Sequence, residues 1–277
     1  MSTNNAISYN RRSSQIHGWT PDWFNSNGFN SSLIEKIKIF QKSYNLAEDG
    51  LVGPETFRVL LSARNNDKSQ YIICGGKRVP IDWQKVVCFD EPGSFTLPGK
   101  SIIKSPGRKP NMFVIHWDAC LNSSTCVRVL QERNLSVHFC IDNDGTIYQL
   151  VDCDDIAQHA AGVNSKSIGV EVSNAFYTKF QSWYEKNGFG KREILKDIPV
   201  HNSVIKECLD FYPIQKQAIS VLLKTVCNHY SIPLDTPDSI TEVPSVASGA
   251  YKGVVSHLHV TKNKIDCAGL DIKNLLK

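Results

Sequence analysis

Two kinds of apolar pattern follow one another along the chain. Between residues 31 and 61, apolar side chains recur at helical spacing, first at Leu33, Ile34, Ile37 and Phe40 and then at Phe57, Leu60 and Leu61. Ser31 or Ser32 is expected to cap the first helix, and Pro54 is expected to open the second. The first 14 residues are polar and are predicted to form a flexible tail. The pattern therefore predicts a small helical domain over residues 15–65.

After residue 110, short apolar runs alternate with amphipathic segments. Strands are predicted at residues 112–117, 136–142, 146–151, 167–173 and 251–257, and helices at 123–133 and 213–228. Strands interleaved with helices predict an α/β domain over residues 111–277, with a mixed central sheet flanked by helices. Residues 66–110 are rich in proline and glycine, and they are predicted to be a linker and an entry segment.

Composition places the chain among ordinary soluble proteins. Its 277 residues are 41% hydrophobic and 21% charged, and the net charge of +4 is too weak to argue for a nucleic-acid partner. No apolar run is long enough to cross a bilayer, and the N-terminal arginines lack the apolar core of a secretory signal. The nine cysteines are irregularly spaced without a CxxC pair, so free thiols in a reducing compartment are expected.

One short segment near the C-terminus gathers zinc-binding side chains. His257, His259 and Cys267 lie between residues 256 and 269, and imidazole and thiolate are ligands that zinc prefers. His116 ends the apolar strand 112–117, where a buried imidazole is costly unless it has a partner. A catalytic zinc needs three protein ligands, so we expect His116 to meet this segment in space.

A carboxylate interrupts another apolar strand. Glu171 lies within Ile168-Gly169-Val170-Glu171-Val172, where a charged side chain is unfavourable unless it faces a site. Burial would raise the pKa of Glu171 toward the range that suits a general base.

Four motifs in this half of the chain carry a family resemblance. In order they are FVIHWD, LSVHFCIDNDGTIYQLVD, AQHAAGVNSKSIGVEVSN and SHLHVTKNKIDCAG, over residues 105–277. They resemble the zinc-dependent N-acetylmuramoyl-L-alanine amidases, a family that shares its fold with the peptidoglycan recognition proteins. The resemblance implies hydrolysis of the amide between N-acetylmuramic acid and L-alanine of the peptidoglycan stem peptide.

The resemblance also implies a role for individual residues. The implied zinc ligands are His116, His257 and Cys267, with His259 as the rival to His257. Glu171 matches the general base, and a lysine that stabilises the oxyanion is expected two residues before the third ligand. That position is Ile265 here, so Lys264 is the candidate and Lys262 a weaker one. The residues implied in substrate binding are His159, Asn174 and Trp117, and His138 is expected to be structural or to support a ligand.

A second resemblance covers residues 34–61. The FQ pair, the DGxxGPxT turn and the closing apolar helix resemble the three-helix peptidoglycan-binding domain of wall hydrolases. Both resemblances together imply a bacteriophage endolysin that acts as a monomer on bacterial peptidoglycan, without stable membrane insertion. Such a protein is expected in the host cytoplasm until lysis and then at the cell wall. A virion-associated lysin or a bacterial autolysin has the same features.

Two other classes of protein stay open at this point. A peptidoglycan recognition protein of the same fold would bind without cutting, but such relatives typically lose the third ligand, which is kept here. A structural zinc protein would need four closed ligands, and the sequence offers three well-placed ones. The insertion over residues 176–210 has no role that the sequence assigns.

Overall fold

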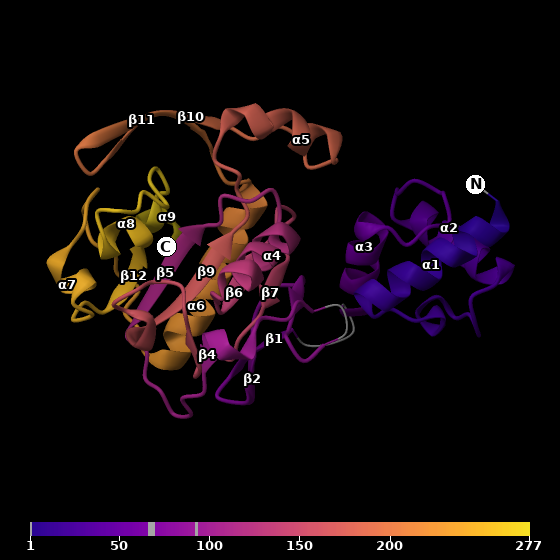
Figure 1. Cartoon of the computed structure of the whole chain (residues 1–277), viewed down its shortest axis with the longest axis horizontal. Helices are drawn as coiled ribbons and strands as arrows, with labels where there is room; N and C mark the ends of the chain where they lie inside the picture. The colour runs from indigo at the N-terminus through magenta and orange to yellow at the C-terminus, as the bar shows by residue number, and fades with distance from the viewer. Residues whose placement is uncertain (1, 66–69, 92–93) are drawn as a thin grey trace. The chain divides into compact units, whose positions relative to one another are not determined.

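The computed structural model describes residues 2–65, 70–91 and 94–277 (Figure 1). The chain divides into two compact units. The N-terminal unit comprises Met1–Ser69 with Asp90–Ser94, and the C-terminal unit comprises Gln70–Phe89 with Phe95–Lys277. Each unit is described by itself.

The N-terminal unit is helical, as predicted. Its elements are α1 (Thr3–His17), the 3-10 turn η1 (Pro21–Phe24), α2 (Ser31–Ser43) and α3 (Pro54–Asn65). The predicted apolar positions of α2 and α3 lie in its core, except Phe40, which is only partly buried. Asn30 caps α2, because its Oδ1 accepts the backbone N–H of Leu33 at 3.0 Å, and the predicted serine caps are the first helical residues instead.

The prediction of a flexible tail over the first 14 residues is wrong, because α1 begins at Thr3 and packs on the rest of its unit. The buried Asn10 amide donates to the carbonyl of Gly50 at 2.9 Å and accepts the N–H of Val52 at 2.9 Å. Ser13 donates to the carbonyl of Val52. Polar side chains of α1 therefore hold the 50–52 turn by hydrogen bonds, a kind of packing that an apolar pattern cannot reveal.

The C-terminal unit contains the predicted mixed sheet. Its six described strands lie in the order β12-β5-β9-β6-β7-β3. Their bounds are β3 Val86–Val87, β5 Met112–Trp117, β6 Phe139–Ile141, β7 Ile147–Gln149, β9 Ser167–Val172 and β12 Gly253–Ser256. β12, β5, β9 and β6 run parallel to one another, and β7 is antiparallel to β6.

The two faces of the sheet have different roles. One face, which includes Phe113, Ile115, Ile168 and Val170, forms the main core with α6 (Pro213–Tyr230). The opposite face carries His116 of β5 and Glu171 of β9, which are register partners. α4 (Ser123–Arg133) belongs to this second face, because its Cys126 thiol lies 4.0 Å from the thiol of Cys140, the β6 partner of Glu171.

The segment predicted as a linker contributes to the sheet. β1 (Tyr71–Cys74) and β2 (Lys77–Pro80) form a hairpin, β3 is an edge strand of the main sheet, and β4 (Ile102–Ile103) pairs with β8 (Ile156–Ala157). Most of residues 70–110 thus belong to the C-terminal unit. Strands of two to four residues between prolines and glycines are too short to give a periodic signal.

Short helices complete the unit. They are η2 (Gly99–Ser101), η3 (Asn164–Lys166), α7 (Pro244–Ala247), α8 (His257–Val260) and α9 (Ile272–Leu275). In the part of the chain that the structure describes, no helix combines the length and apolar character that a membrane crossing requires. The nine cysteines are buried and unpaired, as predicted.

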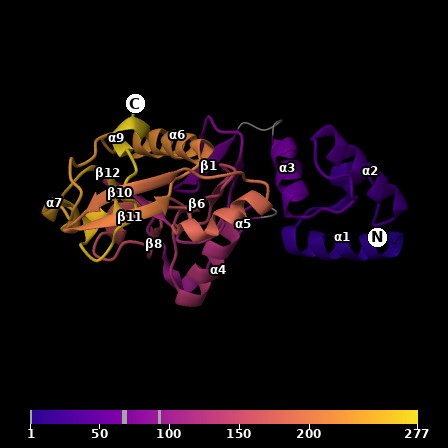
Figure 2. The ribbon, with the colours of Figure 1, turned by 90° about the horizontal axis from the view of Figure 1, so that it is seen from above.

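The insertion after β9 forms a structured arm. It contains η4 (Thr178–Phe180), α5 (Gln181–Lys186) and the antiparallel hairpin of β10 (Ile194–Val200) and β11 (Ser203–Leu209) (Figures 1 and 2). The inner side of the hairpin packs on Trp117, Leu258 and Ala268. These residues adjoin the predicted metal ligands in the chain, so the hairpin supports the segments on which the ligands lie.

A buried arginine anchors this arm. Arg192, only 2% exposed, donates from Nη1 to the carbonyl of Asp210 at 2.8 Å and from Nη2 to that of Ser173 at 2.9 Å. Its guanidinium contacts the rings of both Tyr184 and Tyr212, with its carbon 4.3 and 4.0 Å from their centroids. A single cation thereby joins the arm to the end of β9.

We expect Arg192→Met to loosen the arm. The substitution leaves several buried acceptors without a donor, which should lower the free energy of unfolding by on the order of 3 kcal/mol. Limited proteolysis should then cut within residues 176–210, and urea unfolding should give the loss of stability. The matched control is Lys191→Met at the exposed neighbouring position, expected to stay within about 0.5 kcal/mol. Equal protease resistance of the two variants would contradict the anchoring role.

Candidate metal centre

Strand pairing sets one side of the site. His116 lies near the carboxyl end of β5, directly opposite Glu171 of β9 in a parallel ladder. Register partners in a sheet project their side chains to the same face, so imidazole and carboxylate emerge side by side. The carboxyl ends of parallel strands are the usual edge for ligand sites in α/β sheets.

The other side is formed by a folded-back loop. β12 ends at Ser256, and His257 begins the single helical turn α8. The N–H of Leu258 donates to the carbonyl of Asp266 at 2.8 Å, and the N–H of Cys267 donates to Ser256 Oγ. These two bonds return the 261–267 segment to α8 and bring Asp266 beside His257.

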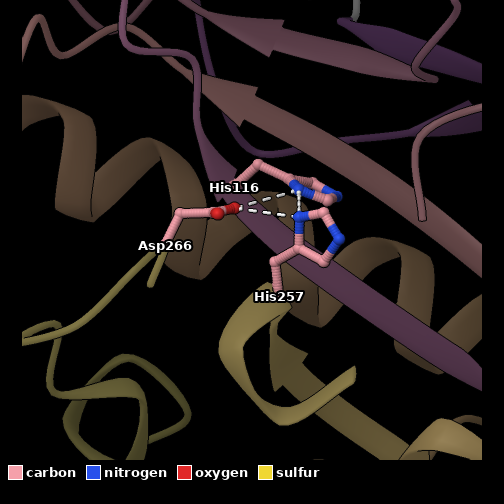
Figure 3. A group of neighbouring side chains, drawn as sticks. All are labelled: His116, His257 and Asp266. Carbon is pink, nitrogen blue, oxygen red and sulfur yellow. Dashed lines mark hydrogen bonds and ion pairs between the residues drawn. The ribbon is translucent and has the colours of Figure 1, made fainter. Parts of the chain in front are cut away.

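Three donor atoms converge at this point. His116 Nδ1 lies 2.9 Å from His257 Nδ1 and 3.2 Å from Asp266 Oδ2, and His257 Nδ1 lies 3.1 Å from the same oxygen. Figure 3 shows the two rings and the carboxylate pointing toward one another. All three residues are buried, and they are the group of metal-binding character that stands out in the described part of the chain.

The environment favours a neutral imidazole at His116 and an ionised carboxylate at Asp266. Burial, aided by the charge of His257, lowers the pKa of His116 to about 4. Burial alone would raise the pKa of Asp266, but hydrogen bonds and charges from His116 and His257 outweigh it and hold that pKa below its usual range. These protonation states leave lone pairs free on His116 and Asp266.

The donor set fits a divalent metal ion. Two imidazole nitrogens and one carboxylate oxygen leave a fourth position open, as catalytic zinc sites require. Ligand atoms around a tetrahedral zinc lie about 3.3 Å apart, close to the separations of 2.9–3.2 Å seen here. Glu171 adds a carboxylate oxygen, Oε2, that is buried and has no hydrogen-bond partner among the described residues.

Comparison with known proteins identifies the fold and its chemistry. The model of the family described as N-acetylmuramoyl-L-alanine amidase matches residues 106–269, more than half of the chain, and includes every residue of this site. The chain belongs to the N-acetylmuramoyl-L-alanine amidase family. A search of curated proteins finds no match to this amidase.

Several solved structures are similar to this chain at low identity. An endolysin N-acetylmuramoyl-L-alanine amidase from Clostridium intestinale is 17% identical with a TM-score of 0.41, and the alignment covers 69% of this chain and 92% of that one. An endolysin from a Thermus scotoductus bacteriophage is 13% identical with a TM-score of 0.39, covering 62% and 86%. The Staphylococcus aureus hydrolase AmiA, in complex with its ligand, is 14% identical with a TM-score of 0.38, covering 72% and 71%.

The third donor corrects the sequence interpretation. His116 and His257 meet as predicted, but the residue beside them is Asp266 rather than Cys267. Successive side chains leave the backbone in different directions, and the Cys267 thiol enters the main core. It also lines a cavity of about 480 Å³, and burial raises its pKa well above the usual range.

The rival histidine also faces away from the amidase site. His259 Nδ1 accepts the N–H of Ser256 at 3.2 Å, and its Nε2 lies 2.8 Å from the carbonyl of Ser239. The helical turn α8, in place of the predicted strand, separates it from His257. Both ring nitrogens of His259 are therefore engaged away from His116.

With Asp266 as the third donor, the position of the lysine agrees with the family pattern. Lys264 stands two residues before Asp266, where the resemblance expects a lysine, so the apparent one-residue slip disappears. Its ammonium is exposed, and its charge reaches both His116 and Glu171, lowering the pKa of each as a minor contribution after burial. This spacing was the signal in the sequence that could have identified Asp266.

Glu171 has the predicted environment. Burial, with smaller contributions from Asp118 and Asp266, raises its pKa well above the usual range. Asp118, a buried carboxylate that the sequence did not single out, accepts the N–H groups of Cys120 and Asn174, each at 2.9 Å. Burial raises the pKa of Asp118 to about 7. Acidic groups therefore cluster beside the metal donors.

The residues predicted to bind substrate lie near the site with other partners. His159 Nδ1 is 3.0 Å from His116 Nε2. The buried Asn174 donates to the carbonyl of Leu209 at 2.8 Å and accepts the N–H of Phe176, and Trp117 packs on Phe176. Their contact with substrate stays a prediction. His138, expected to be structural, accepts the N–H of Gly169 at 3.0 Å.

We expect Asp266→Asn to abolish tight metal binding and Cys267→Ser to preserve it. The first substitution removes the anionic donor, so affinity for zinc should fall more than about 100-fold, beyond what loss of a supporting residue costs. Chelator competition on the purified variants measures this affinity, and Cys267→Ser is the matched neighbour. Loss of zinc in Cys267→Ser, with retention in Asp266→Asn, would restore the sulfur ligand that the sequence suggested.

Proposed function

We propose that the amidase hydrolyses the amide between N-acetylmuramic acid and L-alanine of peptidoglycan with a zinc ion held by His116, His257 and Asp266. The observation that carries this proposal is the convergence of those three buried donors beside Glu171, within the segment that matches the amidase family. The donor chemistry suits zinc better than magnesium or calcium, which prefer oxygen ligands.

The residues of the site have separate tasks in the reaction. Zinc, when bound, polarises the scissile carbonyl and lowers the pKa of water. Glu171 accepts the proton of the attacking water and passes it to the leaving amine, and burial raises its pKa, which makes the carboxylate a stronger base. The Lys264 ammonium stabilises the negative charge that develops on the carbonyl oxygen.

The enzymatic reading is favoured over recognition without cleavage. A protein that only binds has no use for a buried carboxylate at Glu171 without a hydrogen-bond partner, since burial of such a group is unfavourable. The three metal donors and this carboxylate together make up a hydrolytic centre.

The N-terminal unit is proposed to bind the bacterial wall. Two features support this role: the resemblance of residues 34–61 to a peptidoglycan-binding domain, and a cavity of about 480 Å³ within the unit. The cavity is bordered by α1, α2 and the loop at 48–51, and its rim carries Glu35, Lys38 and Asp49. Charged side chains around a cavity can bind the polar groups of a sugar–peptide polymer.

An endolysin-type role in host lysis follows as a proposal. The combination of a proposed wall-binding unit with an amidase unit supports it. The protein would then act as a monomer, first held in the host cytoplasm and then released to the wall.

Digestion of purified peptidoglycan tests the reaction. Mass spectrometry should detect stem peptides with a free L-alanine N-terminus, and a zinc chelator should prevent their release. Glu171→Gln should bind zinc with parent affinity yet lose turnover by about 100-fold or more, because general-base catalysis contributes 10²–10⁴-fold. Absence of these products from every wall type, with the protein still sedimenting with the walls, would favour the recognition protein instead.

Removal of residues 1–69 tests the wall-binding role. The truncated enzyme should lose activity on intact walls by about tenfold or more, because tethering raises the local substrate concentration. Its activity on soluble muropeptides should stay within twofold of the parent. Equal loss on both substrates would contradict a targeting role for the N-terminal unit.

A further inference from the structure

His159 lies behind the metal donor His116, in contact with the strand that carries Glu171. Its Nδ1 is 3.0 Å from His116 Nε2, and its Nε2 is 3.3 Å from Ser167 Oγ. The rings of His116 and His159 are perpendicular, with centroids 5.2 Å apart. His159 therefore contacts the side of the His116 ring that faces away from Asp266.

The hydrogen bonds around these rings have one consistent direction. His116 Nδ1 faces His257 and Asp266, so it must keep its lone pair for a metal ion, and the ring proton belongs on Nε2. That N–H donates to His159 Nδ1. His159 then carries its own proton on Nε2, which donates to Ser167 Oγ, and the Ser167 hydroxyl donates to the carbonyl of Val163 at 2.9 Å. Every donor in this chain meets an acceptor.

The backbone conformation of His159 is fixed independently. Its N–H and that of Ala160 both donate to Asn164 Oδ1, at 3.0 and 2.7 Å. The His159 ring is thus held by its main chain on one side and by Ser167 on the other.

Gly169 makes room for the ring. A Cβ atom at this position would lie 2.6 Å from His159 Cε1 and closer still to Nδ1, far inside van der Waals contact. Ser167, Gly169 and Glu171 alternate along the same face of β9. One face of a single strand therefore supplies an acceptor for His159, space for its ring, and the carboxylate beside the metal donors.

We propose that His159 is a positioning residue, which fixes the ring orientation and tautomer of His116 so that Nδ1 presents its lone pair to the metal ion. This inference rests on the proposed zinc chemistry. It assigns His159, in the segment Ala157-Gln158-His159-Ala160, a supporting role behind a ligand, whereas the family resemblance implied contact with substrate. Outer partners of this kind typically contribute 10–100-fold to metal affinity.

Three variants distinguish loss of the hydrogen bond between His116 and His159 from a general loss of folding stability. His159→Leu removes the acceptor, and His159→Asn keeps an acceptor oxygen near the Nδ1 position. Gly169→Ala removes no polar group, but its methyl group displaces the His159 ring. The control is Ile168→Val, which removes one methylene from the opposite, core face of the same strand and costs about 1 kcal/mol of stability.

Zinc affinity is measured first, by chelator competition on the full chain. His159→Leu and Gly169→Ala should bind zinc 10–100-fold more weakly than the parent. His159→Asn should recover most of the loss, and Ile168→Val should match the parent. Affinities of His159→Leu and Gly169→Ala within twofold of the parent, or an equal loss in Ile168→Val, would overturn the proposal.

The tautomer of His116 is measured second, in metal-free protein, by nitrogen-15 NMR of the imidazole rings. The parent should hold the proton on Nε2 of His116, and Gly169→Ala should populate both tautomers, as should His159→Leu where it folds. An unchanged tautomer in Gly169→Ala would overturn the proposal. A parent that bound no zinc would refute the proposed function instead, because the NMR measurement does not depend on the metal.

Discussion

The parallel pairing of β5 with β9 is the constraint on which the site depends. This register places His116 opposite Glu171 and leaves Gly169 beneath the His159 ring. A shift of one residue would turn these side chains to the α6 face of the sheet, where the apolar core lies. The chemistry of the amidase is therefore fixed by the same apolar alternation that stabilises its sheet, and neither can change alone.

Much of this architecture could be predicted from the sequence. Long apolar runs such as residues 112–117 identified the central strands, and four ordered motifs indicated the amidase family that residues 106–269 match. The helix α1 was missed because its buried face is mostly polar, with Asn10 and Ser13 beside Ala6. The hairpin of β10 and β11 was missed because most of its side chains are exposed, so it lacks an apolar period.

Residue types alone could not decide which side chain is the third metal donor, because that depends on the backbone geometry of the loop. Asp266 and Cys267 are adjacent and both are ligand types, so choice between them is set by the loop that returns to α8. The family spacing of Lys264 pointed to Asp266, whereas the preference of zinc for sulfur pointed to Cys267. The backbone settles which side chain reaches His257, because the bond from Leu258 holds the carbonyl of Asp266 in place.

The nine buried thiols have a consequence for the lifetime of the protein. No disulfide links the described cysteines, so non-covalent interactions maintain the fold. Burial keeps the thiols from oxidants while the chain is folded. Once the chain unfolds in an oxidising medium, nine sulfur atoms become free to form mismatched crosslinks, and return to the native fold is blocked. Survival outside a reducing compartment is then governed by how often the protein opens, which is a rate and not an equilibrium.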